Sequence, residues 1–335
     1  MTRPPDHSPI PEEKVGVLLI NLGTPDAPER GAVKRYLAEF LSDRRVVEIP
    51  PLFWQPILRG IILNTRPAKS AHAYRQVWTQ SGSPLAAITR RQAEALQARL
   101  EGTAMVDWAM RYGNPGIANK IEAMKAAGVT RLLLAPLYPQ YCAATTATAN
   151  DAAFAALAGM RWQPAVRTLP PYYDDPLHIA ALKADAERQL AALDFVPGRL
   201  LLSFHGMPER TLQLGDPYHC HCRKTGRLLG EALGLPVEVS FQSRFGRARW
   251  LEPATEERLK ALPGEGAARL AVLAPGFSAD CLETLEELGI RGRETFLAAG
   301  GTHFARLDCL NDGEAGMDML EALVRRELAG WVDAP

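Results

Sequence analysis

The chain alternates short apolar runs with longer segments in which apolar residues recur at helical spacing. The runs end at glycine, proline or polar residues, which is typical of strands buried within a parallel sheet. This alternation predicts an α/β fold whose helices flank parallel strands. Strands are predicted at 15–21, 105–112, 131–137, 162–168, 199–204, 237–242, 269–274 and 304–310, and helices at 33–41, 91–100, 117–127, 176–193, 222–233 and 315–328.

Three segments of the first half recur in the same order in the second half. VLLINLGTP at 17–25 resembles RLLLSFHGMP at 199–208, VDWAMRYG at 106–113 resembles VSFQSRFG at 239–246, and RLLLAPLYP at 131–139 resembles RLAVLAPGF at 269–277. Such a recurrence indicates two related α/β halves. We expect a ligand-binding cleft between them. Its predicted walls carry Asn21, Arg111, Tyr138, His205, Arg244 and Phe277.

The periodicity is interrupted at 169–176, where LPPYYDDP combines prolines with aspartates. We therefore predict a flexible N-terminal arm at 1–14, a first domain at 15–170 and a second domain at 171–303. The remaining segment, 304–330, contains a strand and a closing helix that we expect to pack back on the first domain.

The charge balance argues against a nucleic-acid partner. The 335 residues include 38 basic and 38 acidic side chains, so no global field favours a polyanion. The first residues are polar and proline-rich, without the apolar core of a signal peptide, and we expect a cytoplasmic protein. The segment PLFWQPILRGIIL at 51–63 is too short and too interrupted to span a bilayer. It is interpreted as a core-packing helix, or else as an apolar lip that contacts a membrane surface or an apolar ligand.

The five cysteines are an odd number and do not suggest a disulfide framework. Cys220 and Cys222 are separated by one residue, whereas zinc sites normally use a spacing of about two to four residues. A [2Fe–2S] cluster needs four thiolates and is kept as a minority interpretation.

His205 follows the apolar run 199–204, at the predicted carboxyl end of a strand. Ligands of open α/β sheets bind beyond such ends, so His205 is either a reactive group or a residue that only caps the strand. Downstream, Asp280, Glu283 and Glu287 are spaced to share one face of a predicted helix. Imidazole and carboxylate groups suit a divalent metal such as Fe(II) or Zn(II), and they also suit general base catalysis. The nearby arginines and aromatic residues favour a large, flat, partly apolar ligand with acidic groups.

The ordered motifs of the chain resemble those of the ferrochelatases, bacterial type. They are LLINLGTP, QSGSPL, MRYGNP, APLYPQY, SFHGMPER, GDPYHC, FQSRFG and PGFSADCLETLEE. The resemblance covers residues 15 to about 329. The resemblance implies two similar Rossmann-like domains, each with a four-stranded parallel sheet flanked by helices, and a cleft between them. It also implies a lyase that inserts Fe2+ into protoporphyrin IX to give protoheme with release of two protons, the last step of heme biosynthesis.

The same resemblance suggests which residues act. His205 and Glu283 match the catalytic pair regarded as the iron site, and either group could accept a pyrrole proton or bind the metal. The residues implied to contact the porphyrin are Arg111, Tyr112, Arg66, Leu22, Asp280 and Glu287.

The resemblance implies protoporphyrin IX and ferrous iron as substrates, with peripheral membrane contact as a further option. No cofactor is expected beyond the substrate iron. Family members with a [2Fe–2S] cluster often have a cysteine-bearing C-terminal extension, whereas this chain has no cysteine after Cys309. Cluster-bearing animal members also place a cysteine where this chain has Ala143 instead. A cluster of that kind is therefore not expected.

Two alternatives stay open at this point. One is a coproporphyrin III ferrochelatase, but coproporphyrin has more acidic groups than protoporphyrin, and the apolar segment around Leu52, Phe53 and Trp54 favours the less charged ring. The other is a non-catalytic two-lobed protein that binds porphyrin or metal, which would show stoichiometric binding without turnover.

Overall fold

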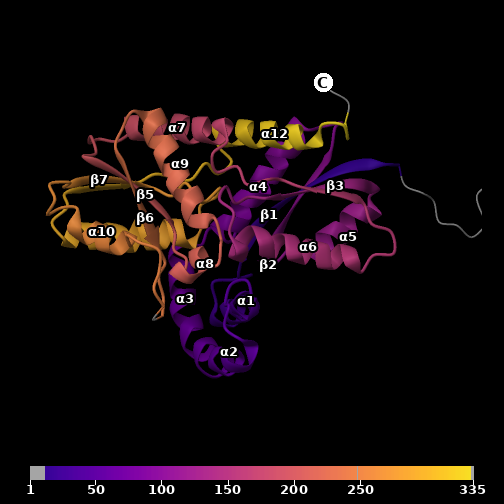
Figure 1. Ribbon diagram of the computed structural model, residues 1–335, viewed down its shortest axis with the longest axis horizontal. Coiled ribbons are helices and arrows are strands. Elements are labelled where there is room, and N and C mark those ends of the chain that lie inside the picture. Colours follow the sequence, from indigo (N-terminus) through magenta and orange to yellow (C-terminus); the bar gives the residue numbers. More distant parts are fainter. Residues whose placement is uncertain (1–11, 247, 333–335) are drawn as a thin grey trace, which may run out of the picture.

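The computed structural model describes residues 12–246 and 248–332 (Figure 1). The predicted N-terminal arm therefore lies outside the described residues except for 12–14, and Lys14 already belongs to the first strand.

Two parallel sheets of four strands form the centre of the molecule, and both have the same topology. The first has the order β2-β1-β3-β4 and the second the order β6-β5-β7-β8. This confirms the predicted fold of two similar α/β halves. The strands of the first sheet are β1 (Lys14–Thr24), β2 (Met105–Gly113), β3 (Val129–Pro136) and β4 (Ala165–Thr168); those of the second are β5 (Arg199–His205), β6 (Val237–Gln242), β7 (Arg269–Leu273) and β8 (His303–Arg306).

The central strand β1 is apolar on both faces because helices cover both sides of its sheet. Val17 and Leu19 belong to the core cluster that includes residues of helix α4, whereas Leu18 and Ile20 belong to the cluster that includes residues of helix α5. A continuous apolar run is the pattern expected for such a doubly covered strand.

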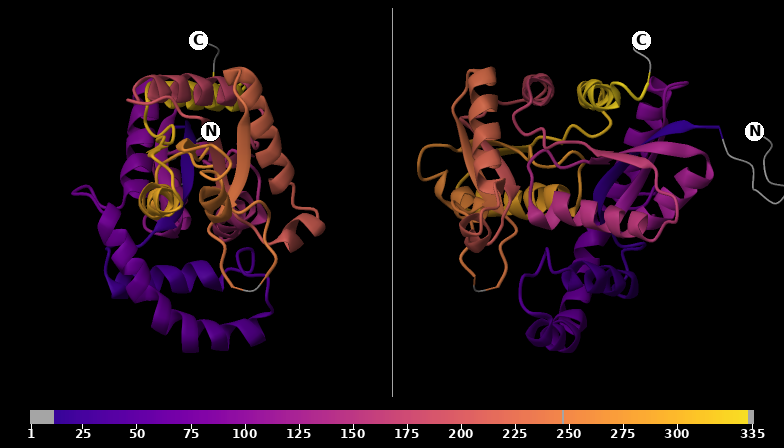
Figure 2. Two further views of the ribbon diagram at one scale, coloured as in Figure 1. Left: turned by 90° about the vertical axis from the view of Figure 1, so that its left-hand side faces the viewer. Right: turned by 45° about the vertical axis from the view of Figure 1, so that its right-hand side comes forward.

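The helices and π-helical segments (η) are distributed over both halves (Figure 2). Those between residues 30 and 158 are α1 (Arg30–Ser42), α2 (Pro51–Ile57), η1 (Leu58–Ile62), α3 (Leu63–Val77), α4 (Pro84–Arg99), α5 (Ile117–Ala126), η2 (Ala143–Ala147) and α6 (Thr148–Ala158). The later ones are α7 (Pro176–Ala191), α8 (Glu209–Gln213), α9 (Tyr218–Leu233), α10 (Thr255–Ala261), η3 (Glu283–Gly292), α11 (Arg293–Ala298) and α12 (Glu314–Leu328).

The last strand and the closing helix belong to different parts of the molecule. Strand β8 pairs with β7, so the second sheet continues past residue 303, where the sequence analysis had placed its end. Residues 303–306 belong to the second sheet because they pair with β7 in parallel register. Helix α12, by contrast, lies beside α7 and α4 (Figure 2), and Arg99 of α4 forms ion pairs with Asp318 and Glu321 of α12. The other domain boundaries stay predictions.

The segment 51–63 combines the two predicted roles, because Leu58 and Leu63 belong to a hydrophobic core cluster while other apolar side chains of the segment are exposed. It forms α2 and η1, which project with α1 and α3 away from the two sheets (Figure 1). Leu58 is buried, but Leu52 is 81% exposed and Phe53 is 66% exposed. Apolar composition predicts that a segment avoids water, but it does not specify what the segment packs against. Among the described residues, none of the helices combines the length and apolar character needed to cross a bilayer.

Candidate active site

A cavity lies between the two halves, where the carboxyl ends of their strands meet. Its walls come from the ends of β1 and β5, from the segments after β3 and β7 and from helices of both halves. Of the predicted wall residues, Asn21, Tyr138, His205 and Phe277 line it. Glu283, predicted to act together with His205, lines it as well, and so does Leu22.

The ring of His205 has one nitrogen available for chemistry. Its Nδ1 lies 2.7 Å from the carbonyl oxygen of Gly206. A carbonyl can only accept, so Nδ1 carries the hydrogen and the lone pair resides on Nε2. The carbonyl of His205 accepts a hydrogen bond of 3.0 Å from the hydroxyl of Tyr218, which holds the end of β5. His205 can therefore accept a proton or bind a metal through Nε2.

Glycine is required directly after His205. A Cβ at Gly206 would lie 2.5 Å from the carbonyl oxygen of Gln242, on the neighbouring strand β6. The close approach allows the Gly206 N–H to donate to that carbonyl at 2.7 Å. The SFHG motif thus ends β5 in a fixed geometry beside the cavity.

Glu283 opens the π-helical segment η3 and is surrounded by protonated groups. Burial raises the pKa of Tyr36 and of Tyr74 well above the usual value for a phenol, and the nearby Glu283 carboxylate adds to both shifts. Burial also raises the pKa of the Cys281 thiol, again with a contribution from Glu283. These neighbours stay neutral at physiological pH and can only donate hydrogen bonds toward the carboxylate.

The same reasoning applies to the remaining phenols of the cavity. Burial raises the pKa of Tyr138 and Tyr218 well above the usual value. The titratable side chains that line the cavity are therefore four neutral phenols and one neutral thiol in addition to His205 and Glu283. Only the imidazole and the carboxylate of this wall are suited to exchange protons or to bind a metal near neutral pH.

Asp280 does not share a helix face with Glu283, which corrects the expected stripe of three carboxylates. It precedes η3, is 4% exposed, and its Oδ1 lies 2.8 Å from Nη1 of Arg306 on β8. Thr284 and Asn311 donate to the same carboxylate at 2.7 Å each. The ion pair with Arg306 explains this position, because it orients the Asp280 side chain toward β8 and not toward the cavity.

Glu287 lies one turn of η3 after Glu283 but is also engaged by protein groups. Its carboxylate accepts from the N–H of Ser243 at 2.8 Å and from the Ser243 hydroxyl at 2.6 Å. Glu287 is not among the residues that line the cavity. It holds the loop after β6.

Arg111 and Tyr112 face Asp43 rather than the cavity. Nη2 of Arg111 lies 2.6 Å from the Asp43 carboxylate, and the Tyr112 hydroxyl donates to it at 2.8 Å. Although burial opposes ionisation of Asp43, hydrogen bonds from Thr148, Arg45 and Tyr112 and the charge of Arg111 lower its pKa. Both side chains are thus occupied by Asp43 and Thr148, and neither lines the cavity. The predicted wall residue Arg244 likewise pairs with Glu257 instead.

Arg66 of α3 lies over the ring of Phe245, which belongs to the second half. Its guanidinium carbon is 5.0 Å from the ring centroid, a cation–π contact between the two halves. Burial lowers its pKa. Among the described residues it forms no ion pair, so its charge is available to an acidic group of a ligand.

Sequence reasoning missed much of the apolar and phenolic lining. Tyr36 and Tyr74 come from helices α1 and α3. No motif singled them out, and helix periodicity assigns such residues to a core. Tyr218 lies in the GDPYHC motif, which could have indicated it.

The cysteines do not gather into a metal site. Cys142, Cys222, Cys281 and Cys309 are buried and Cys220 is exposed, and all five thiols are free. Within residues 12–246 and 248–332, no three His, Cys, Asp or Glu side chains come together in a group that could hold a metal ion.

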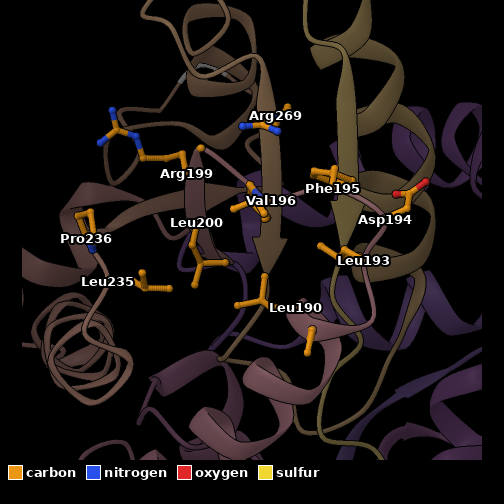
Figure 3. Close-up of a pocket in the computed structure, with 13 residues that line it drawn as sticks. Leu190, Leu193, Asp194, Phe195, Val196, Arg199, Leu200, Leu235, Pro236 and Arg269 are labelled. Carbon is orange, nitrogen blue, oxygen red and sulfur yellow. The ribbon is translucent and has the colours of Figure 1, made fainter.

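A second pocket lies beside the amino-terminal ends of β5 and β7, whereas the first lies at the carboxyl ends of the strands (Figure 3). Its volume is about 680 Å³ and its lining is mostly apolar, with Arg269 at one side. It contains none of the predicted site residues. The chemistry expected from the sequence therefore belongs to the cavity between the halves.

Comparison with known proteins agrees with this geometry. The sequence model of the family described as Ferrochelatase matches residues 14–328. A protein of Rhizobium leguminosarum bv. trifolii named "Ferrochelatase" is 53% identical over 337 residues, which cover 98% of each chain. One of Azoarcus sp. with the same name is 52% identical and covers 96% of this chain and 90% of its own.

Solved structures show similarity of fold. SirB from Bacillus subtilis with Fe3+ has a TM-score of 0.57 and 13% identity, and the match covers 95% of this chain and 97% of SirB. CbiX, described as the terminal enzyme for biosynthesis of siroheme in denitrifying bacteria, has a TM-score of 0.51 at 14% identity, covering 94% of this chain and all of CbiX, 100%. Both support a two-half chelatase fold.

Proposed function

The chain belongs to the ferrochelatase family, and we propose that it inserts Fe2+ into protoporphyrin IX in the cavity between its two halves. It is a lyase that inserts a metal ion into a porphyrin during heme biosynthesis. The observation that carries the choice of site is the composition of the cavity wall, where His205 and Glu283 stand among phenols and a thiol kept neutral by burial.

Metal insertion requires the loss of two protons from the pyrrole nitrogens. Nε2 of His205 offers a lone pair because Nδ1 donates to Gly206. The Glu283 carboxylate offers a second acceptor. Both groups are also acceptable ligands of ferrous iron, so the pair can pass the substrate metal to the ring as the protons leave.

The ring itself is proposed to lie against the apolar part of the wall. Leu22, Phe277 and Leu282 line the cavity and provide surfaces for a flat macrocycle. A cavity that fits a bent ring better than a flat one favours the transition state, because bending turns the nitrogen lone pairs toward the metal. The other assigned residues, Arg111, Tyr112, Asp280 and Glu287, are proposed to act through the wall segments that they hold.

Protoporphyrin is proposed as the substrate rather than coproporphyrin because free positive charge is scarce near the cavity. Arg111 is neutralised by Asp43, whereas Arg66 forms no ion pair among the described residues. The exposed apolar side chains of α2 and η1 also favour a ring with fewer acidic groups.

We further propose that α2 and η1 form a peripheral contact with a membrane. Leu52, Phe53, Ile57 and Ile61 are exposed there. Exposed apolar side chains gathered on a projecting element are typical of interfacial binding. We also propose a cytoplasmic location and no cofactor beyond the substrate iron.

The reaction is tested by mixing the protein anaerobically with Fe2+ and either porphyrin and following the change in absorption. The expected result is repeated turnover, with a higher kcat/KM for protoporphyrin. Binding of one equivalent without turnover would support a carrier instead. A higher kcat/KM for coproporphyrin would reverse the choice of substrate while leaving the activity in place.

A further inference from the structure

We infer that Gln242, at the carboxyl end of β6, is a positioning residue that holds the first turn of η3, with Glu283, against the end of β5, with His205. The inference rests on the proposed function. It concerns a residue that neither lines the cavity nor carries a reacting group.

Gln242 contacts the backbone next to both members of the pair. It is the register partner of His205 on the neighbouring strand, and its carbonyl accepts from the Gly206 N–H at 2.7 Å. Its side-chain Nε2 donates to the carbonyl of Glu283 at 3.2 Å. One side chain thus links the segment that carries the imidazole to the segment that carries the carboxylate.

The orientation of the Gln242 amide is set by a buried hydroxyl. Ser203 of β5 donates to Oε1 of Gln242 at 2.6 Å, so Nε2 is directed to the Glu283 carbonyl, which can only accept. Gln242 is 3% exposed and Ser203 is fully buried. The Ser203 hydroxyl also lies 2.8 Å from that of Thr255, which supports it from α10. A buried amide whose oxygen and nitrogen are both hydrogen-bonded has one orientation, and it therefore holds Ser203 and the Glu283 carbonyl in fixed positions.

The next residue holds η3 a second time. Ser243 bonds the Glu287 carboxylate through its N–H and its hydroxyl, at 2.8 and 2.6 Å. Its φ of 64° is uncommon for a residue with a side chain, and such conformations persist where surrounding contacts enforce them. Gln242 and Ser243 therefore hold η3 at two positions four residues apart, Glu283 and Glu287.

Two fixed points matter because η3 is π-helical. Such segments are rare and occur frequently at functional sites. The hydrogen bond from Gln242 to the Glu283 carbonyl fixes the backbone position from which the Glu283 side chain extends. Small misplacements of a reacting group, about 1 Å, can cost about 10²-fold in rate.

The test compares substitutions at the two ends of the Gln242 amide. Gln242→Glu keeps oxygens that accept from Ser203 but removes the donor to Glu283. Gln242→Met has similar length and removes both, without adding a charge. Gln97→Met is the matched control, because the Gln97 amide is likewise held at both ends, by the carbonyl of Ala104 and the N–H of Val106, but does not line the cavity.

We expect kcat for iron insertion to fall about 10- to 100-fold in both Gln242 variants. The KM and the porphyrin Kd, measured by fluorescence quenching, should stay within about threefold, and Gln97→Met should keep at least about half of kcat. Circular dichroism and the unfolding midpoint verify that each variant is folded. If one Gln242 variant does not fold, the other carries the test.

Wild-type kcat in a folded Gln242 variant would overturn the inference, as would an equal loss of kcat in Gln97→Met or a higher KM at unchanged kcat. These outcomes differ from a failure of the proposed function, in which the unmodified protein does not turn over porphyrin at all.

Discussion

Nη1 of Arg306 on β8 lies 2.8 Å from Oδ1 of Asp280, and both side chains are largely removed from water. Asp280 therefore belongs to the support of η3, because its carboxylate is occupied by partners from the second sheet and from the segment before α12. We therefore expect a substitution of Asp280 to affect the stability of the fold more than the chemistry of the cavity.

Asp280→Ala should lower the free energy of unfolding by about 3 kcal/mol, since it leaves the partly buried Arg306 with only the exposed Asp308 as counterion and removes the acceptor of Thr284 and Asn311. Asp312→Ala is the control, because Asp312 pairs with Arg91 at the surface and should contribute about 1 kcal/mol or less. Urea unfolding measures both. An Asp280→Ala protein with unchanged stability but weaker iron binding would return Asp280 to the active site.

His178 of α7 makes the stability of the fold depend on pH. It is 1% exposed, and burial lowers its pKa to about 4, although a hydrogen bond with the backbone of Tyr173 and the charge of Asp175 oppose the shift. The folded state keeps the ring neutral while the unfolded chain takes up a proton below about pH 6.5. Stability should therefore be complete above pH 6.5 and decline as the pH falls toward 4.

The loss attributable to His178 should be about 1 kcal/mol between pH 6.5 and 5.5. Urea unfolding of the unmodified protein and of His178→Phe at both pH values isolates it, because phenylalanine cannot take up the proton. His303→Ala serves as a control, since His303 is exposed. A stability difference between wild type and His178→Phe that is the same at both pH values would refute the assignment.

Much of the fold could be predicted because its signal is local. The inner strands β1, β3, β5 and β7 coincide with apolar runs, and a run buried on both faces can be recognised without knowing which elements lie beside it. The repeat also predicted that the two sheets share one topology. Helices such as α3 and α6 were missed because their apolar residues are few or small, so the helical period is weak.

The candidate site was predictable only in part because its geometry depends on distant residues. His205 and Glu283 lie at strand and helix ends, where position itself is informative. The orientation of the Asp280 side chain, however, depends on its ion pair with Arg306, and that of Arg111 depends on its ion pair with Asp43. Helical spacing also assumed an α-helix, whereas η3 begins only at Glu283.

The exposed lip of α2 and η1 gives a prediction about membranes. Replacing Leu52 and Phe53 together by glutamate should abolish cosedimentation with anionic lipid vesicles, because apolar contact area is replaced by charge. Iron insertion into porphyrin dissolved in detergent should stay near the wild-type rate. The same double change at Val196 and Leu235, exposed on the second half, is the control. Vesicle binding that survives the lip change but not the control change would contradict the proposed contact.

The central claim is that His205 and Glu283 perform the insertion. The most direct measurement is anaerobic turnover of Fe2+ and protoporphyrin by His205→Ala and Glu283→Gln, with porphyrin binding measured on the same samples and His303→Ala as the control. We predict a loss of at least about 10²-fold in kcat for each of the two variants, with porphyrin affinity retained and the control unaffected. Turnover by a folded His205→Ala protein at the wild-type rate would contradict the account.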